Sequence, residues 1–135
     1  MKKSKMRKVG YLMHMGQTEE AIKRAENLYN TDYNFDASCY LGCLFINGNR
    51  KYKIAKDLDK GRYWLKIGAD QNHADSQFFY GLSFLQNAKK PDEFLKAYFY
   101  LEKAKSNGSI YSQELNAHNW ICLWFVSLDF TNFIS

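Results

Sequence analysis

The sequence predicts an all-α fold built from repeated helix pairs. Its 135 residues include a single proline, and no stretch shows the sustained apolar–polar alternation of a half-buried strand. Two stretches also form offset copies of one pattern. Gly42 recurs as Gly81, 39 positions later, and Lys60 recurs as Lys96, 36 positions later. A repeat of this length is typical of stacked helix pairs, none of which can bury its apolar face alone.

An N-terminal helix pair is expected within residues 1–35 of a single domain that spans 1–135. A first helix over 4–15 should end at Gly16. Thr18 is a suitable N-cap for the second helix, whose first turn then carries two acidic residues that face the positive end of the helix dipole.

The first clear repeat covers 36–73. Asp36 can cap its first helix, in which Gly42 should allow close approach of a neighbouring helix, and the buried stripe consists of Ala37, Leu41, Phe45 and Gly48. A polar, basic loop follows. Asp57 or Asp59 then caps the partner helix, whose buried stripe is Tyr63 or Trp64, with Ile67 and Gly68.

The second repeat covers 74–108. Its first helix occupies 74–87 and contains Gly81, again as a packing residue. Pro91 lies in the first turn of the next helix, where proline is favoured, and that helix stops at Asn107–Gly108. A degenerate capping helix over 109–135 completes about seven helices.

These residues resemble the Sel-one-like repeat, a relative of the tetratricopeptide repeat. The family's first helix reads A-x-x-x-L-G-x-x-Y-x-x-G, and its second contains D-x-x-K-A-x-x-W-Y-x-K-A-A-x-x-G. The matching residues of the first copy are Ala37, Leu41, Gly42, Phe45 and Gly48, then Asp57, Lys60, Trp64 and Ala69. Those of the second copy are Gly81, Phe84, Lys96, Ala97, Tyr100, Lys103, Ala104 and Gly108. The chain departs from the family in a loop after Gly48 that is three residues longer, in Gly61 and Gly68 where alanines are usual, and in Asn87 at the loop glycine.

The resemblance implies a right-handed helical-repeat solenoid of antiparallel helix pairs that binds a protein or peptide through its concave face. Small members with the Lys, Asn, Tyr, Phe and Ile bias of this chain also resemble bacterial immunity proteins, which neutralise a cognate toxin.

Nothing in the sequence indicates catalysis, a cofactor or a metal. His14, His73 and His118 are far apart, and no H-E-x-x-H, C-x-x-C or G-x-S-x-G element is present. Cys39 and Cys43 lie one helical turn apart and are interpreted as small core residues. We therefore expect no enzyme.

The composition is 46% hydrophobic and 17% aromatic, which is enough for a packed core, and the net charge is +5. The three cysteines are odd in number, and no apolar run approaches the roughly 18 to 20 residues that span a bilayer. No convincing signal peptide is present. The expected location is the cytoplasm, without membrane association.

Candidate partner-binding residues occupy first-helix positions that the core stripe should leave free. They are Tyr40, Leu44 and Asn47 in the first copy, Phe79, Ser83 and Gln86 in the second, and His118 and Asn119 in the degenerate third. A further group lies in the basic loop (residues 49–56) and consists of Arg50, Lys51, Tyr52 and Lys53. Aromatic side chains and amides suit a protein-binding surface.

The sequence thus favours a non-catalytic protein-binding repeat protein, most specifically an immunity protein that neutralises a toxin. Two alternatives stay open. One is a scaffold or regulatory adaptor for a peptide or protein, and the other is an RNA- or DNA-binding module that uses the basic loop. Nucleic acid is the less favoured partner. The apolar segment 120–133 should pack internally as the cap of the array, so that the chain is a monomer, or a weak dimer through this helix.

Overall fold

The structure is a computed structural model that describes residues 2–113 of the chain. This part contains seven helices and no strand, so the predicted all-α fold is confirmed there. The helices are α1 (Lys2–His14), α2 (Thr18–Asp32), α3 (Phe35–Asn47), α4 (Leu58–Asp70), α5 (Ala74–Gln86), α6 (Pro91–Ser106) and α7 (Ile110–Gln113). The rest of the predicted capping helix, with its apolar segment, lies outside the described residues.

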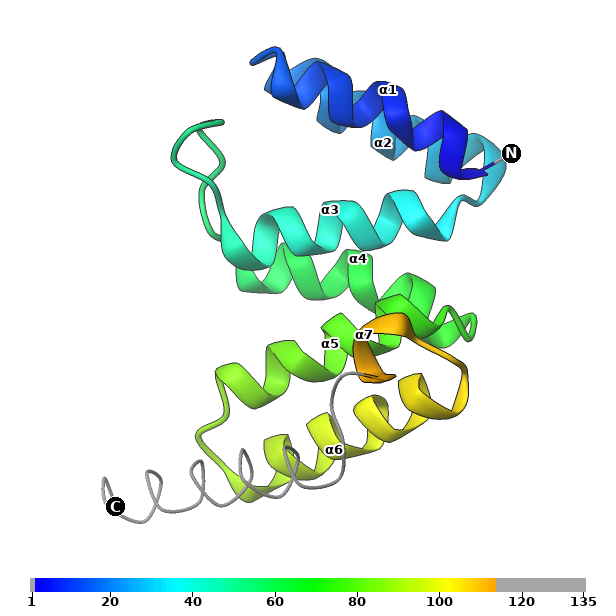
Figure 1. The fold of residues 1–135 in the computed structure, drawn as a ribbon. Coiled ribbons are helices and arrows are strands. Elements are labelled where there is room, and N and C mark those ends of the chain that lie inside the picture. The colour runs from blue at the N-terminus through cyan, green and yellow to red at the C-terminus, as the bar shows by residue number, and fades with distance from the viewer. Residues whose placement is uncertain (1, 114–135) are drawn as a thin grey trace.

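Consecutive helices pack as neighbours in three layers. α1 contacts α2, α3 contacts α4 and α5 contacts α6, while α2–α3 and α4–α5 contacts join one pair to the next. Figure 1 shows the pairs one below another, from blue α1 and α2 to yellow-green α5 and α6. The first helices of the pairs also touch, α1 with α3 and α3 with α5. Among the described residues, no helix is long and apolar enough to cross a membrane.

The helix starts follow local capping rules, with two corrections to the prediction. Thr18 is not an N-cap, because Gln17 holds that position and Thr18 is the first helical residue of α2. Asp36 does not cap α3 either. Asn34 does, by accepting a hydrogen bond from the backbone N–H of Ala37 over 3.2 Å. The chain reaches Asn34 through Tyr33, whose left-handed conformation (φ 50°) ends α2.

Of the two predicted caps for α4, the structure selects Asp57. Its carboxylate accepts a hydrogen bond from the backbone N–H of Lys60 over 3.1 Å. On the same helix Trp64 is the buried aromatic, at 9% exposure, whereas Tyr63 is 62% exposed. The stripe prediction omitted Leu65, which is fully buried together with Leu41 and Leu101. Leu41 belongs to one buried hydrophobic cluster, formed mainly by residues of α1, α2 and α3, whereas Leu65 and Leu101 belong to a second cluster, formed mainly by residues of α4, α5 and α6.

The predicted packing role of two mid-helix glycines is confirmed. A Cβ atom on Gly42 would lie 2.7 Å from Cδ2 of Leu65, and one on Gly81 would lie 2.7 Å from Cγ of Leu101. Gly61, which departs from the family pattern, has the same explanation, because a Cβ there would lie 2.8 Å from the backbone nitrogen of Ile46. The two helices of a pair, α3 with α4 and α5 with α6, therefore approach more closely at these points than alanine would allow.

Candidate functional site

A cavity of about 430 Å³ runs along the first helices of the pairs. We call it the α3–α5 groove. Its lining combines aromatic, thiol, amide and carboxyl side chains from four helices and the turn before α5. Helix α3 contributes Asp36, Cys39, Tyr40, Cys43 and Asn47, and α5 contributes Asp75 and Phe79. The other lining residues are Met6 of α1, His73 of the turn before α5 and Tyr111 of α7.

Helical periodicity explains why these side chains converge. Asp36, Tyr40, Cys43 and Asn47 follow at steps of four, three and four, which places them on one face of α3. The core stripe of α3 contains Ala37, Leu41 and Phe45 and is buried. The groove face is therefore the side of α3 that the helix pair itself does not cover.

The structure brings three of the predicted partner-binding residues together in this groove, namely Tyr40, Asn47 and Phe79. Leu44 is half-buried and packs against the core cluster that includes Leu41. Gln86 is exposed at the C-terminal end of α5 and does not line the groove.

The prediction that the core leaves Ser83 free is wrong. Ser83 is 1% exposed, and its hydroxyl donates to the carbonyl oxygen of Tyr80 over 2.6 Å. The guanidinium of Arg62 donates to both the hydroxyl and the carbonyl oxygen of Ser83, over 3.3 and 3.0 Å. Arg62 belongs to α4, 21 positions away, and nothing in the sequence indicated this contact. His118 and Asn119 lie outside the described residues.

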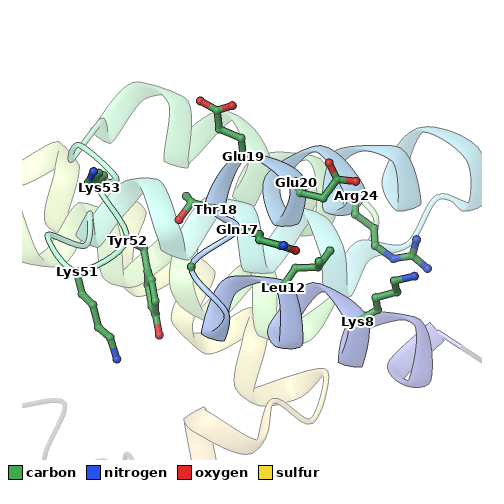
Figure 2. A pocket seen from close by; sticks show the side chains of 11 residues that line it. Lys8, Leu12, Gln17, Thr18, Glu19, Glu20, Arg24, Lys51, Tyr52 and Lys53 are labelled. Carbon is green, nitrogen blue, oxygen red and sulfur yellow. The ribbon is translucent and has the colours of Figure 1, made fainter.

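The predicted residues of the basic loop line a different cavity. Two backbone hydrogen bonds of 2.8 Å between Asn49 and Ile54 close the loop, and Ile54 anchors it at 8% exposure. Lys51, Tyr52 and Lys53 line a cavity of about 890 Å³ together with residues of the α1–α2 turn (Figure 2). Arg50 is exposed and is not among the lining residues.

This second cavity carries both signs of charge. Lys8 and Arg24 line it opposite the loop, but so do the carboxyl groups of Glu19 and Glu20 (Figure 2). A nucleic-acid surface depends on accumulated positive charge, and acidic side chains in the same cavity oppose the approach of phosphates. The local charge pattern therefore gives little support to the nucleic-acid alternative.

A hydrogen-bonded chain joins the N-termini of α3 and α5 at the edge of the groove. The Nε2 atom of His73 lies 3.0 Å from Oδ1 of Asp36, and its Nδ1 atom accepts a hydrogen bond from the backbone N–H of Ser76 over 3.2 Å. The Ser76 hydroxyl lies 2.7 Å from the same Nδ1 atom. Asp36 and His73 are 37 positions apart, so sequence spacing did not indicate their contact.

This Asp36–His73–Ser76 order resembles the one that activates a serine nucleophile. Ser76, however, is 0% exposed and packs against Gly68 of α4, so its hydroxyl has no open path to a substrate. The geometry instead gives the three residues a structural role. His73 caps α5, and its contact with Asp36 ties that helix to α3 in the preceding pair.

The two groove cysteines are free thiols on the same face of α3. The hydrogen bond between the thiols of Cys39 and Cys43, followed by burial, raises the pKa of Cys39 well above its ordinary value, which keeps that thiol protonated and weakly nucleophilic. Cys39 is buried as predicted, while Cys43 is only half-buried. Among the described residues, no group of three or more His, Cys, Asp or Glu side chains is arranged to hold a metal ion.

The remaining polar groups of the groove are partly fixed by the fold. The hydroxyl of Ser109 donates to Oδ1 of Asp75 over 3.1 Å. Burial raises the pKa of Tyr40, and burial followed by the charge of Asp75 raises the pKa of Tyr111, so both phenols stay neutral hydrogen-bond donors at pH 7. The groove thus offers aromatic faces, phenol hydroxyls and two carboxylates, a set suited to holding another molecule.

Comparisons of this chain with protein-family models, with curated proteins and with solved structures find no match.

Proposed function

We propose that this chain is a right-handed helical-repeat solenoid of antiparallel helix pairs that binds a protein partner and performs no catalysis. Repetition of structural roles supports the solenoid. Gly42 and Gly81 are 39 positions apart, and each admits the following helix at close range. Leu65 and Leu101 are 36 positions apart, and both are fully buried. Equivalent positions with equivalent environments are expected of stacked repeats.

The observation that carries the binding proposal is the convergence of Tyr40, Phe79 and Asn47 in the α3–α5 groove. Tyr40 and Phe79 occupy equivalent positions of successive pairs, 39 residues apart. Both are half-buried, so each keeps part of its ring accessible while its backbone is held in a helix. Rigid aromatic side chains in a partly desolvated groove are the commonest anchors of protein–protein interfaces.

The specific proposal is an immunity protein that occupies or blocks the active surface of a cognate bacterial toxin. It rests on the residue bias and on the resemblance given above. A toxin inhibitor needs no chemistry of its own, because surface complementarity is sufficient. A scaffold or adaptor role would use the same groove, since one fold serves many partners.

The first experiment is capture of the tagged chain from its native lysate in high salt, with mass spectrometry of what remains bound. A single stoichiometric toxin-like polypeptide supports the immunity role, and co-expression should then rescue cells from that toxin. Housekeeping or secretion components favour an adaptor. Nucleic acid that is retained only at low salt, with no protein at high salt, would contradict a protein partner.

The captured partner then tests the groove directly. Tyr40→Ala and Phe79→Ala should each weaken binding at least about tenfold, as truncation of an aromatic anchor typically does. Tyr11→Ala and Phe99→Ala are matched controls, because these rings are 62% and 58% exposed and do not line the groove. Equal losses in both sets would contradict the groove as the binding site, and thermal melts must show that all four variants are folded.

A further inference from the structure

We infer that the α3–α5 groove recognises a cationic side chain, an arginine or a lysine, that projects from the partner protein. This inference rests on the proposed function and names the chemistry of its partner. The chain as a whole carries a net charge of +5. The groove lining has the opposite character, because it contains the carboxyl groups of Asp36 and Asp75 and neither lysine nor arginine. The other titratable groups that line it are His73, the two thiols and two phenols.

The fold orients both carboxylates without neutralising them by a lysine or arginine. His73 contacts Oδ1 of Asp36, and the Ser109 hydroxyl donates to Oδ1 of Asp75. Each hydrogen bond engages one oxygen, and within the described part of the chain the second oxygen of each carboxylate has no hydrogen-bond partner. Asp36 and Asp75 are 39 positions apart, so the two acids repeat with the helix pairs as Tyr40 and Phe79 do. A guanidinium or ammonium group entering the groove would meet these oxygens as acceptors.

The aromatic walls of the groove add a second attraction for a cation. The Phe79 and Tyr111 rings lie 4.8 Å apart between centroids, and Tyr111 stacks on Phe78 at 5.6 Å. A cation within about 6 Å of a ring centroid is attracted by the negative face of the ring. Arginine combines both attractions, because its planar guanidinium can stack on a ring while it binds a carboxylate in a bidentate manner.

Aromatic rings elsewhere in the fold are contacted by lysine and arginine side chains of the chain itself. Phe45 and Phe84, equivalent core positions, are covered by cations of the chain itself: Lys60 lies 4.4 Å from the Phe45 centroid, while Arg62 and Lys96 lie 4.0 and 4.6 Å from the Phe84 centroid. In the described part of the chain, the groove rings of Tyr40, Phe79 and Tyr111 have no such cation. The cation for these rings would come from the partner.

Acidic residues near helix N-termini need no ligand, because the helix dipole favours them. Aspartates at the same helix position, inside and outside the groove, allow the effect of the helix dipole to be separated from recognition of a cation. Asp36, Asp59, Asp75 and Asp92 are each the second residue of α3, α4, α5 and α6. Only Asp36 and Asp75 line the groove, whereas Asp59 and Asp92 are exposed elsewhere. The double variant Asp59→Asn/Asp92→Asn therefore removes the same charges from the same helix positions without altering the groove.

The test is a titration of the whole ¹⁵N-labelled chain with three peptides, followed by NMR. The probes are acetyl-Leu-Arg-Leu-amide, its neutral citrulline analogue and acetyl-Leu-Glu-Leu-amide. We expect saturable shifts of the backbone amides of Tyr40 and Phe79, with the arginine peptide at least about fivefold tighter than the citrulline peptide. Asp36→Asn/Asp75→Asn should abolish this preference, since asparagine keeps an acceptor for His73 and Ser109 but loses the charge.

Three results would overturn the inference: equal affinity for the arginine and citrulline peptides, no saturable shift in the groove, or an equal loss of preference in the Asp59→Asn/Asp92→Asn control. The partner protein separates this inference from the proposed function. If Tyr40→Ala and Phe79→Ala weaken partner binding while Asp36→Asn/Asp75→Asn does not, the cation inference fails and the proposed function stands. If neither set affects the partner, the groove is not its binding site, and the inference about a cationic side chain of that partner fails with it. The proposed binding of a protein partner fails only if the capture experiment retains no protein at high salt.

Discussion

Replacing Gly81 by alanine should destabilise the fold, although the same change in an open helix is stabilising. A Cβ at Gly81 would lie 2.7 Å from Cγ of Leu101, 3.0 Å from the carbonyl oxygen of Ala97 and 3.2 Å from the backbone nitrogen of Leu101. Two of these atoms belong to the backbone of α6, so a rotamer change cannot relieve the contact. Because comfortable carbon contacts are about 3.5–4.0 Å, α5 and α6 would have to separate by roughly 0.5–1 Å.

That separation weakens the packing of Leu101 and Ala97, which are 0% and 1% exposed. Overpacking of this kind costs about 1–3 kcal/mol, and the better helix propensity of alanine returns about 1 kcal/mol. We therefore expect the free energy of unfolding of Gly81→Ala to fall by up to about 2 kcal/mol, which corresponds to a Tm lower by up to roughly 10 °C.

Gly10→Ala is the matched control. Gly10 also lies inside a helix, α1, but a Cβ there would meet no atom within 4 Å. Its replacement should raise the free energy of unfolding by up to about 1 kcal/mol. Urea denaturation followed by circular dichroism at 222 nm measures both variants. A Gly81→Ala protein as stable as Gly10→Ala would refute the close approach of α5 and α6.

Two further predictions concern capping and pH. Asn34→Ala should lower the free energy of unfolding by about 1–2 kcal/mol, and by more than Asp57→Ala does. Asn34 is 0% exposed, so water cannot replace the hydrogen bond that its side chain accepts from the backbone N–H of Ala37. Equal losses for the two variants in urea denaturation would contradict this. The raised pKa of Cys39 predicts that stability falls as pH rises above about 8.5, where the unfolded thiol ionises but the folded thiol does not. The free energy of unfolding should fall by at most about 1.4 kcal/mol per pH unit because of this single group. Cys39→Ala should reduce this pH dependence between about pH 8.5 and 10. An unchanged pH dependence would show that Cys39 is not the group responsible.

The helices were predictable because their signals are local. Pro91 begins α6, Gly16 with a φ of 81° follows α1, and Asp57 caps α4, all within one turn of the residues that they affect. The errors at Thr18 and Asp36 are also local. Several residues near each boundary were chemically able to cap, and backbone conformation selected Gln17 and Asn34 instead. Boundaries are therefore less secure than the existence of a helix.

The candidate site was predictable only in part. Helical spacing identified Tyr40, Asn47 and Phe79 as positions beside the core stripe, and all three line the groove. The acidic pair also has a signal in the sequence, since Asp36 and Asp75 share the 39-residue spacing of Tyr40 and Phe79. No comparable signal marked Ser83 as buried, because the Arg62 side chain that binds it comes from the preceding helix pair.

The sequence by itself determined the all-α class, the positions of the helices and the two glycines where helices approach closely. The helices follow from the period of the hydrophobic residues and from capping residues, which act within a helix. The close approaches follow from two glycines, which have no side chain and recur with the repeat. Only the tertiary structure decided that Asp36 meets His73, that Trp64 is buried and Tyr63 is not, and that the basic loop lines a cavity separate from the groove. Those outcomes depend on how one pair is rotated against the next, which is set by packing between residues distant in sequence.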